Sequence, residues 1–311
     1  MVKPKRSGLT LVEILVVVGI IAILTGMLLP AIGMVRKTAR EAKQKVQFTA
    51  IDLALATFKN DYGSLPPSDR YTWLRDTQQT ENSSGAQKLA EALLGWDLLG
   101  FHPDSGWRAD GMNRWPYRVG TTTHGEGTYF LYDRTVEYDM NKRKSRYLDL
   151  DTANAVRLGV AGNQDGLFDL GAVGVPLAAN TFVLGDVFGK GKDVTLLDGS
   201  RRKSGLPVLY YRANPSEKVR ENIYDSRDND YLIVAKEQID LAQRGTAPLR
   251  APGRFWNPLA GSVATFYDFI TDWRASTQNF PVPHKGDSYI LISAGYDGFY
   301  GTDDDVCNFQ R

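Results

Sequence analysis

Four aspartates near the C-terminus have the types and spacing of a cation site. Asp297 lies six to eight residues before the run Asp303–Asp305, and Gly298 and Gly301 permit sharp turns that let the two groups converge. Hard cations such as Ca²⁺ take several oxygen ligands at once, and adjacent carboxylates repel each other unless a cation or solvent separates them. The pattern is not an EF-hand, because its D-x-D-x-D-G run and terminal Glu are absent. The alternative interpretation is a solvated acidic turn.

The other reactive residue types form no recognised catalytic pattern. The three histidines make no HxH, HxxxH or HExxH pair, and the single cysteine, Cys307, can form no internal disulfide. No Ser/His/Asp, Cys/His or P-loop signature is present. With 37 basic and 36 acidic residues the net charge is +1, which gives no indication of nucleic-acid binding. Acidic stretches at 163–169 and 225–230 have the composition of polar turns, and we predict that the chain is not an enzyme.

One carboxylate, Glu13, lies within the longest apolar segment, Leu9–Val35. Residues 14–35 carry no charge over 22 positions. At roughly 1.5 Å per residue a helix of this length can cross a hydrocarbon core of about 30 Å. A carboxylate is costly in such a helix, which indicates that Glu13 has a function. A short basic leader, Met1–Gly8, precedes the segment.

Two simpler interpretations of the segment remain open. A secretory signal peptide could be cleaved at Ala31-Ile-Gly33, but the apolar run exceeds a normal h-region and Glu13 interrupts its start. A plain membrane anchor explains the length but neither Gly8 nor Glu13. Basic residues flank both ends of the segment, so the positive-inside rule does not decide its orientation. They are Lys3, Lys5 and Arg6 on one side, and Arg36, Lys37, Arg40, Lys43 and Lys45 on the other.

The order of basic leader, Gly8, Leu-Thr-Leu-Val-Glu13 and apolar run resembles the class III signal of type IV pilins and type II secretion pseudopilins. The resemblance implies that prepilin peptidase cuts between Gly8 and Leu9. It implies that Leu9, where Phe is usual, becomes the N-methylated first residue. It further implies that Glu13 and the helix-kinking Pro30, the fifth and twenty-second mature residues, act in assembly.

The rest of the chain predicts an α+β, pilin-like fold, in which a long N-terminal helix (membrane anchor plus stem) packs on a β-rich C-terminal head. Apolar residues at helical spacing continue the helix to Tyr62, where Gly63 and Pro66-Pro67 stop it. The run Leu55–Pro67 looks like the end of this helix in the major pseudopilins. Further helices are predicted over 86–99 and 266–273, and loops over 101–123. Strands are predicted at Thr181–Leu184, Val208–Arg212, Tyr231–Val234 and Ser288–Ser293.

The predicted organisation follows from these segments. It comprises a cleaved leader (1–8), a transmembrane helix half (9–35), an amphipathic stem (36–62) and a periplasmic head (63–311), with an enlarged insertion at about 100–205. The acidic loop, 293–306, resembles the calcium loop of the major pseudopilin. By that resemblance one Ca²⁺ would bind Asp297, Asp304, Asp305 and the carbonyl of Ala294, with Asp303 as an extra or substitute ligand.

The function implied is a structural subunit of a periplasmic pseudopilus that supports type II protein secretion. Its partners would be copies of itself and other pseudopilins, prepilin peptidase, the inner-membrane secretion assembly platform and the lipid bilayer, without nucleic acid. The chain would cross the bacterial inner membrane once, with its head in the periplasm. A type IV pilin or minor tip pseudopilin is the alternative within the class. A membrane-anchored periplasmic binding or hydrolytic domain without assembly is the alternative from another class.

Overall fold

The computed structural model contains two compact units, Met1–Lys43 and Gln44–Arg311, and the boundary between them falls inside the first helix. The structure describes residues 10–75, 78–81, 83–112, 117–119, 122–124, 130–159, 166–168, 177–178, 180–195, 201–233, 235, 266–277 and 280–310.

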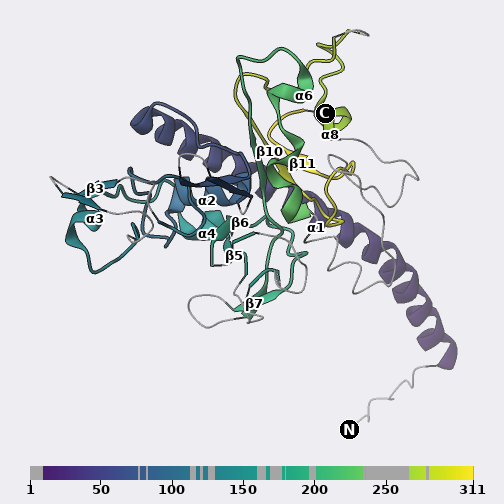
Figure 1. Ribbon diagram of the computed structural model, residues 1–311. Coiled ribbons are helices and arrows are strands. Elements are labelled where there is room, and N and C mark those ends of the chain that lie inside the picture. Colours follow the sequence, from purple (N-terminus) through teal and green to yellow (C-terminus); the bar gives the residue numbers. More distant parts are fainter. Residues whose placement is uncertain are drawn as a thin grey trace. The chain divides into compact units, whose positions relative to one another are not determined.

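Helix α1 (Leu11–Tyr62) runs without interruption for 52 residues (Figure 1). It ends where predicted, because Gly63 adopts a left-handed conformation (φ +77°) and its N–H donates to the Lys59 carbonyl at 2.8 Å. By length and composition α1 is able to cross a membrane, and its most apolar stretch is exposed in the isolated chain. Pro30 lies within the bounds of α1, but its side chain is outside the described part of the chain.

The last five turns of α1 belong to the second unit and bury one face in its core. Ile51, Leu55 and Phe58, three to four residues apart, are almost fully buried. On the opposite face Val46 and Leu53 are 67% and 71% exposed. This contrast shows that residues 44–62 form an integral core helix of the head.

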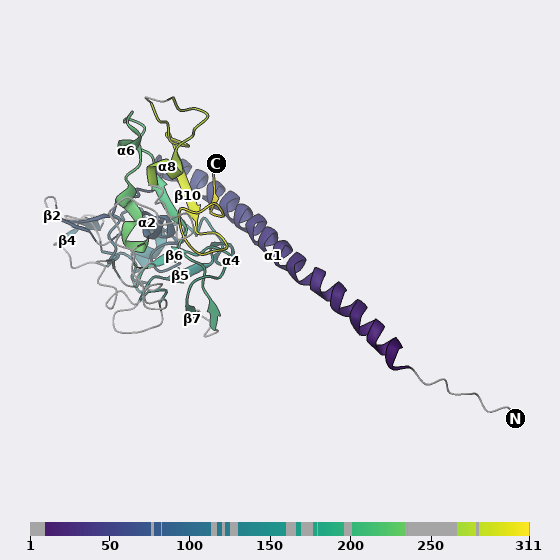
Figure 2. The ribbon, with the colours of Figure 1, turned by 90° about the vertical axis from the view of Figure 1, so that its right-hand side faces the viewer.

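The core sheet has three antiparallel strands in the order β11–β10–β9. They are β9 (Leu209–Arg212), β10 (Tyr289–Ser293), whose five residues are all buried, and β11 (Val306–Cys307). Helix α2 (Gly85–Leu94) packs against β9 and β6 (Phe182–Leu184), and Figures 1 and 2 both place it beside β6. The sheet and α2 confirm the predicted α+β class.

The remaining elements are short. The other strands pair as antiparallel two-stranded ribbons, β1 with β2, β3 with β4, β5 with β6 and β7 with β8. Their bounds are β1 Tyr71–Arg75, β2 Gln78–Glu81, β3 Tyr117–Val119, β4 Thr122–His124, β5 Ala155–Arg157, β7 Asp193–Thr195 and β8 Arg201–Lys203. The short helices are α3 Glu137–Lys142, α4 Leu150–Ala153, α6 Arg220–Ile223, η1 Ser226–Asn229 and α8 Phe266–Ile270.

Some predicted elements are wrong in type or extent. The strand predicted at Tyr231–Val234 is helical over residues 231–233. Its β-branched composition is overridden because the preceding Asn229 side chain accepts from Ala86 N (2.9 Å) and donates to Tyr210 O (2.8 Å), which fixes the chain in a turn. The helix predicted over 86–99 ends at Leu94, because Gly95 has φ +86°. The loops predicted over 101–123 include strand β3 and part of β4.

Candidate functional sites

Glu13 lies at the third position of α1 and forms a reciprocal cap with Thr10. One Glu13 carboxylate oxygen accepts from the Thr10 backbone N–H (2.7 Å) and hydroxyl (2.8 Å). In return, the Thr10 hydroxyl accepts from the Glu13 backbone N–H at 3.3 Å. This is a capping box, which satisfies N–H groups that the start of a helix leaves unpaired.

The capping role of Glu13 was not predicted, although its signal, Thr-x-x-Glu before an apolar run, stands in the sequence. The carboxylate therefore has a local role in the isolated chain as well as the assembly role predicted for it. Gly8 and Leu9, the predicted cleavage and methylation residues, lie outside the described residues.

In the acidic loop Asp304 lies beside Asp297, and the hydroxyl of Thr302 is within hydrogen-bond distance of both Asp304 and Asp305. One oxygen of Asp304 accepts from the backbone N–H groups of Tyr296 (2.7 Å) and Asp297 (2.9 Å). Asp297 accepts from Phe299 N (2.8 Å) and Asp305 from Gly301 N (2.7 Å). The turn depends on Gly295 (φ +65°), where a Cβ would collide with the Asp304 carbonyl.

In the same loop one hydroxyl lies close to three oxygens. The single hydroxyl proton of Thr302 faces Asp304 Oδ1 at 2.7 Å, Asp305 Oδ1 at 3.2 Å and the Phe299 carbonyl at 3.4 Å. Burial, and then the neighbouring Asp304, raise the pKa of Asp297 to about 6. Carboxylate and carbonyl oxygens are the ligand types that a hard cation takes.

Two of the predicted ligands are less well placed. The Ala294 carbonyl accepts from Gly298 N at 3.2 Å, and Asp303 is exposed. Among the described residues, no group of three or more His, Cys, Asp or Glu side chains has an arrangement that holds a metal ion. The loop therefore offers a partial ligand set, and calcium stays a prediction.

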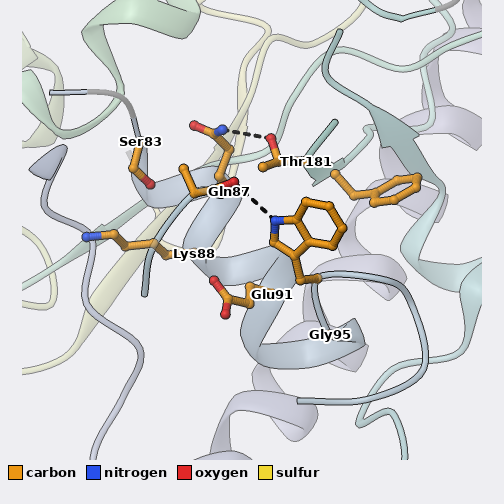
Figure 3. A pocket seen from close by; sticks show the side chains of 9 residues that line it. Ser83, Gln87, Lys88, Glu91, Gly95 and Thr181 are labelled. Carbon is orange, nitrogen blue, oxygen red and sulfur yellow. Dashed lines mark hydrogen bonds between the residues drawn. The ribbon is translucent and has the colours of Figure 1, made fainter. Parts of the chain in front are cut away.

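A small cavity beside α2 contains buried polar groups that the sequence did not single out (Figure 3). It is large enough for about one water molecule. Gln87 donates to the Thr181 hydroxyl at 2.7 Å across one wall. Lys88, with a side chain only 3% exposed, pairs with Asp69 at 3.0 Å, and burial lowers its pKa.

The buried Glu91 on the same helix also has hydrogen-bond partners. Its carboxylate accepts from the Ser105 hydroxyl at 2.6 Å and the Tyr132 hydroxyl at 2.8 Å, and burial raises its pKa. Lys88 and Glu91 thus hold distant segments against α2. Their partners lie far away in sequence, so no local sequence pattern predicts these contacts.

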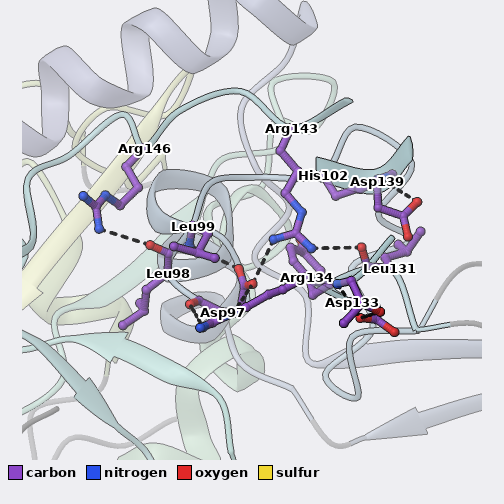
Figure 4. Close-up of polar contacts among 12 residues, drawn as sticks. Asp97, Leu98, Leu99, His102, Leu131, Asp133, Arg134, Asp139, Arg143 and Arg146 are labelled. Carbon is purple, nitrogen blue, oxygen red and sulfur yellow. Dashed lines mark hydrogen bonds and ion pairs between the residues drawn. The ribbon is translucent and has the colours of Figure 1, made fainter. Parts of the chain in front are cut away.

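A second polar cluster attaches α3 and its flanking residues to the rest of the head (Figure 4). The Asp97 carboxylate pairs with Arg143 at 2.8 Å and Arg134 at 3.4 Å. His102 Nε2 and Asp139 Oδ1, on side chains with no solvent exposure, lie 3.5 Å apart. His102 Nδ1 accepts from the Asp104 backbone N–H at 3.1 Å, so the imidazole carries no proton at that atom.

Comparison with known proteins bears on the N-terminal region. Residues 3–29 match the family model described as the prokaryotic N-terminal methylation motif. This is the class III prepilin signal, and together with the long apolar α1 it fits a single-pass, pilin-like membrane protein. The motif indicates a structural subunit rather than an enzyme, and it implies processing by a prepilin peptidase and assembly into filaments. Neither the curated proteins nor the solved structures gave a match.

Proposed function

We propose that this chain is a structural subunit of a type II secretion pseudopilus, anchored in the bacterial inner membrane with its head in the periplasm. It assembles through α1 with copies of itself and other pseudopilins, on the inner-membrane assembly platform. Prepilin peptidase removes residues 1–8, and Leu9 is then N-methylated. The observation that carries the proposal is the methylation motif at residues 3–29, which overlaps the start of the 52-residue helix α1.

Glu13 is the residue on which assembly depends in this proposal. An ionised carboxylate at the start of a lipid-embedded helix costs a few kcal/mol unless a cation offsets it. Cleavage after Gly8 creates such a cation, the N-terminal amine of Leu9, on each neighbouring subunit. The capping box means that Glu13 also stabilises its own helix, by about 1 kcal/mol for a typical cap. Any test has to separate the two roles.

Two matched substitutions separate them. Glu13→Gln keeps the Thr-x-x-Gln capping pattern but removes the charge. Thr10→Val removes the capping hydroxyl but keeps the charge. Each variant is expressed with a complete secretion assembly system, and sheared filaments are quantified by pelleting, with processing followed by mass.

We expect both variants to be inserted and cleaved, Glu13→Gln to lose filaments, and Thr10→Val to keep them. Normal filaments from Glu13→Gln would contradict the charge role of Glu13. Loss of filaments in Thr10→Val, with normal filaments from Glu13→Gln, would assign Glu13 to capping alone. A wild-type chain that is cleaved but stays dispersed would instead favour an anchored domain without assembly.

We further propose that the acidic loop binds one Ca²⁺ through Asp297, Asp304 and Asp305, with Ala294 and Asp303 as the weaker candidates. The support is the position of Asp304 and Asp305 around the Thr302 hydroxyl and the proximity of Asp297 to Asp304. A bound cation would neutralise this loop and stabilise the end of β10 and the start of β11, which flank it.

Thermal melting of the full chain in detergent tests the calcium proposal. At calcium a hundredfold above its Kd, binding adds about 2.7 kcal/mol, or about 5–10 °C in Tm for a unit of this size. Magnesium should substitute poorly. The calcium-dependent shift should vanish in Asp304→Asn and Asp297→Asn but persist in Asp287→Asn, an exposed aspartate outside the loop. Equal wild-type melting in calcium and in chelator would leave a solvated acidic turn.

A further inference from the structure

A group of basic side chains follows the apolar part of α1 in the first unit. Arg36, Arg40 and Lys43 are exposed, and their spacing of four and three residues places them on one face of the helix. Lys37 is partly covered and faces Glu41 at 3.9 Å. We refer to Arg36, Lys37, Arg40 and Lys43 as the basic collar. With four cations and one carboxylate, residues 36–43 carry a net charge of +3 (4 − 1).

The length of the helix fixes the depth of the collar in a bilayer. The 22 uncharged residues 14–35 span about 33 Å, close to the thickness of a hydrocarbon core. When they fill that core, Arg36 lies at its boundary. The following eight residues rise by about 12 Å, through the headgroup layer of that leaflet. Long basic side chains at such a position extend their charges toward the phosphates.

We propose that the basic collar binds the headgroups of anionic phospholipids in the leaflet where α1 leaves the membrane. Charge complementarity supports this, because several cations on a continuous helix, three of them exposed on one face, lie in the layer that holds the lipid phosphates. The inference rests on the membrane insertion of α1, which is part of the proposed function. It goes beyond that function by naming the lipid class that the subunit selects.

The effect is large enough to measure. Each basic residue near an anionic surface contributes about a fivefold change in affinity at low salt. Removing Arg36, Arg40 and Lys43 together should therefore abolish a preference for anionic lipid. Because the interaction is electrostatic and lies at the surface, it should weaken as ionic strength rises.

Energy transfer to labelled lipids tests this in the full chain. A donor dye is placed on Ala42→Cys, an exposed position, in a Cys307→Ser background. The protein is reconstituted in vesicles of 70% phosphatidylcholine and 30% phosphatidylglycerol. Each lipid is supplied in turn with an acceptor on its acyl chain. The triple variant Arg36→Gln/Arg40→Gln/Lys43→Gln is compared with Arg201→Gln/Lys203→Gln/Lys218→Gln, which removes three exposed cations from the head.

We expect several-fold enrichment of phosphatidylglycerol over phosphatidylcholine around the wild type and the head variant, and none around the collar variant. Equal enrichment in the collar variant and the wild type would overturn the proposal, as would a wild type without preference. Resistance to alkaline carbonate extraction is recorded for every sample. A chain that is extracted would overturn both this inference and the anchoring in the proposed function. An anchored chain without lipid preference would overturn this inference alone.

Discussion

Two leucines on α1 test whether residues 44–62 pack into the core of the head. Leu55 is fully buried against the core, whereas Leu53, two residues earlier, is 71% exposed. Both have the same side chain and the same helical backbone. Replacing each by Ala therefore changes only the packing that surrounds it.

The magnitudes follow from burial. Leu55→Ala removes buried methyl groups and leaves a cavity, at a cost of about 3 kcal/mol. For a unit of this size that lowers Tm by about 6–12 °C. Leu53→Ala removes little buried area and places a better helix former at an exposed site, so its effect should be within about 0.5 kcal/mol.

The assay is thermal unfolding of the full chain in detergent, followed by near-ultraviolet circular dichroism. This signal reports the packing of aromatic side chains, and Phe58 lies close to several of them, including Tyr62, Phe101 and Tyr147. It is insensitive to the apolar part of α1, which the micelle holds helical. Equal shifts in both variants, or no shift in Leu55→Ala, would refute the packing of residues 44–62 into the head.

Three further predictions concern the head. Burial lowers the pKa of His102 despite Asp104 and Asp139 nearby, so the free energy of unfolding of His102→Gln relative to wild type should rise as pH drops below about 6.5 in denaturant titrations; no such rise in His102→Gln would contradict this. Burial raises the pKa of Asp228 to about 8, so the stability of Asp228→Asn relative to wild type should rise from pH 5 to pH 8; a constant difference would contradict this. Gly100→Ala should lower Tm by at least about 4 °C, because φ is +112° and the new Cβ would meet a backbone carbonyl; an unchanged Tm would show that the turn is different.

The sequence predicted the parts of the fold that have a local signal. The stem was predictable because apolar residues recur at helical spacing up to Tyr62 and Gly63 ends the run. Strands β9 and β10 were predictable from short β-rich runs between turn residues. The segment Tyr231–Val234 was wrongly predicted as a strand because its composition favours one. The hydrogen bonds of Asn229 with the backbone of distant residues decide the local conformation instead.

The candidate sites, too, were predictable only where the sequence signal is local. The turns of the acidic loop were predictable from Gly298 and Gly301, because glycines act within a few residues and both adopt a positive φ. The burial of Lys88 and Glu91 was not predictable, because the sequence does not distinguish a buried charged residue of a helix from one on its exposed face. Lys88 pairs with Asp69, and Glu91 accepts hydrogen bonds from Ser105 and Tyr132. These partners are distant in sequence and come close only in the folded head.

The central claim, that the chain is a prepilin-type subunit, is tested most directly by the mass of its N-terminus. The full-length gene is expressed with a prepilin peptidase, and the protein is extracted from membranes and digested for mass spectrometry. We expect an N-terminal peptide that begins at Leu9, one methyl group heavier where the methylase is present, and no processing when Gly8 is replaced by a bulky residue. A mature protein that still begins at Met1, or one that begins after Gly33, would contradict it.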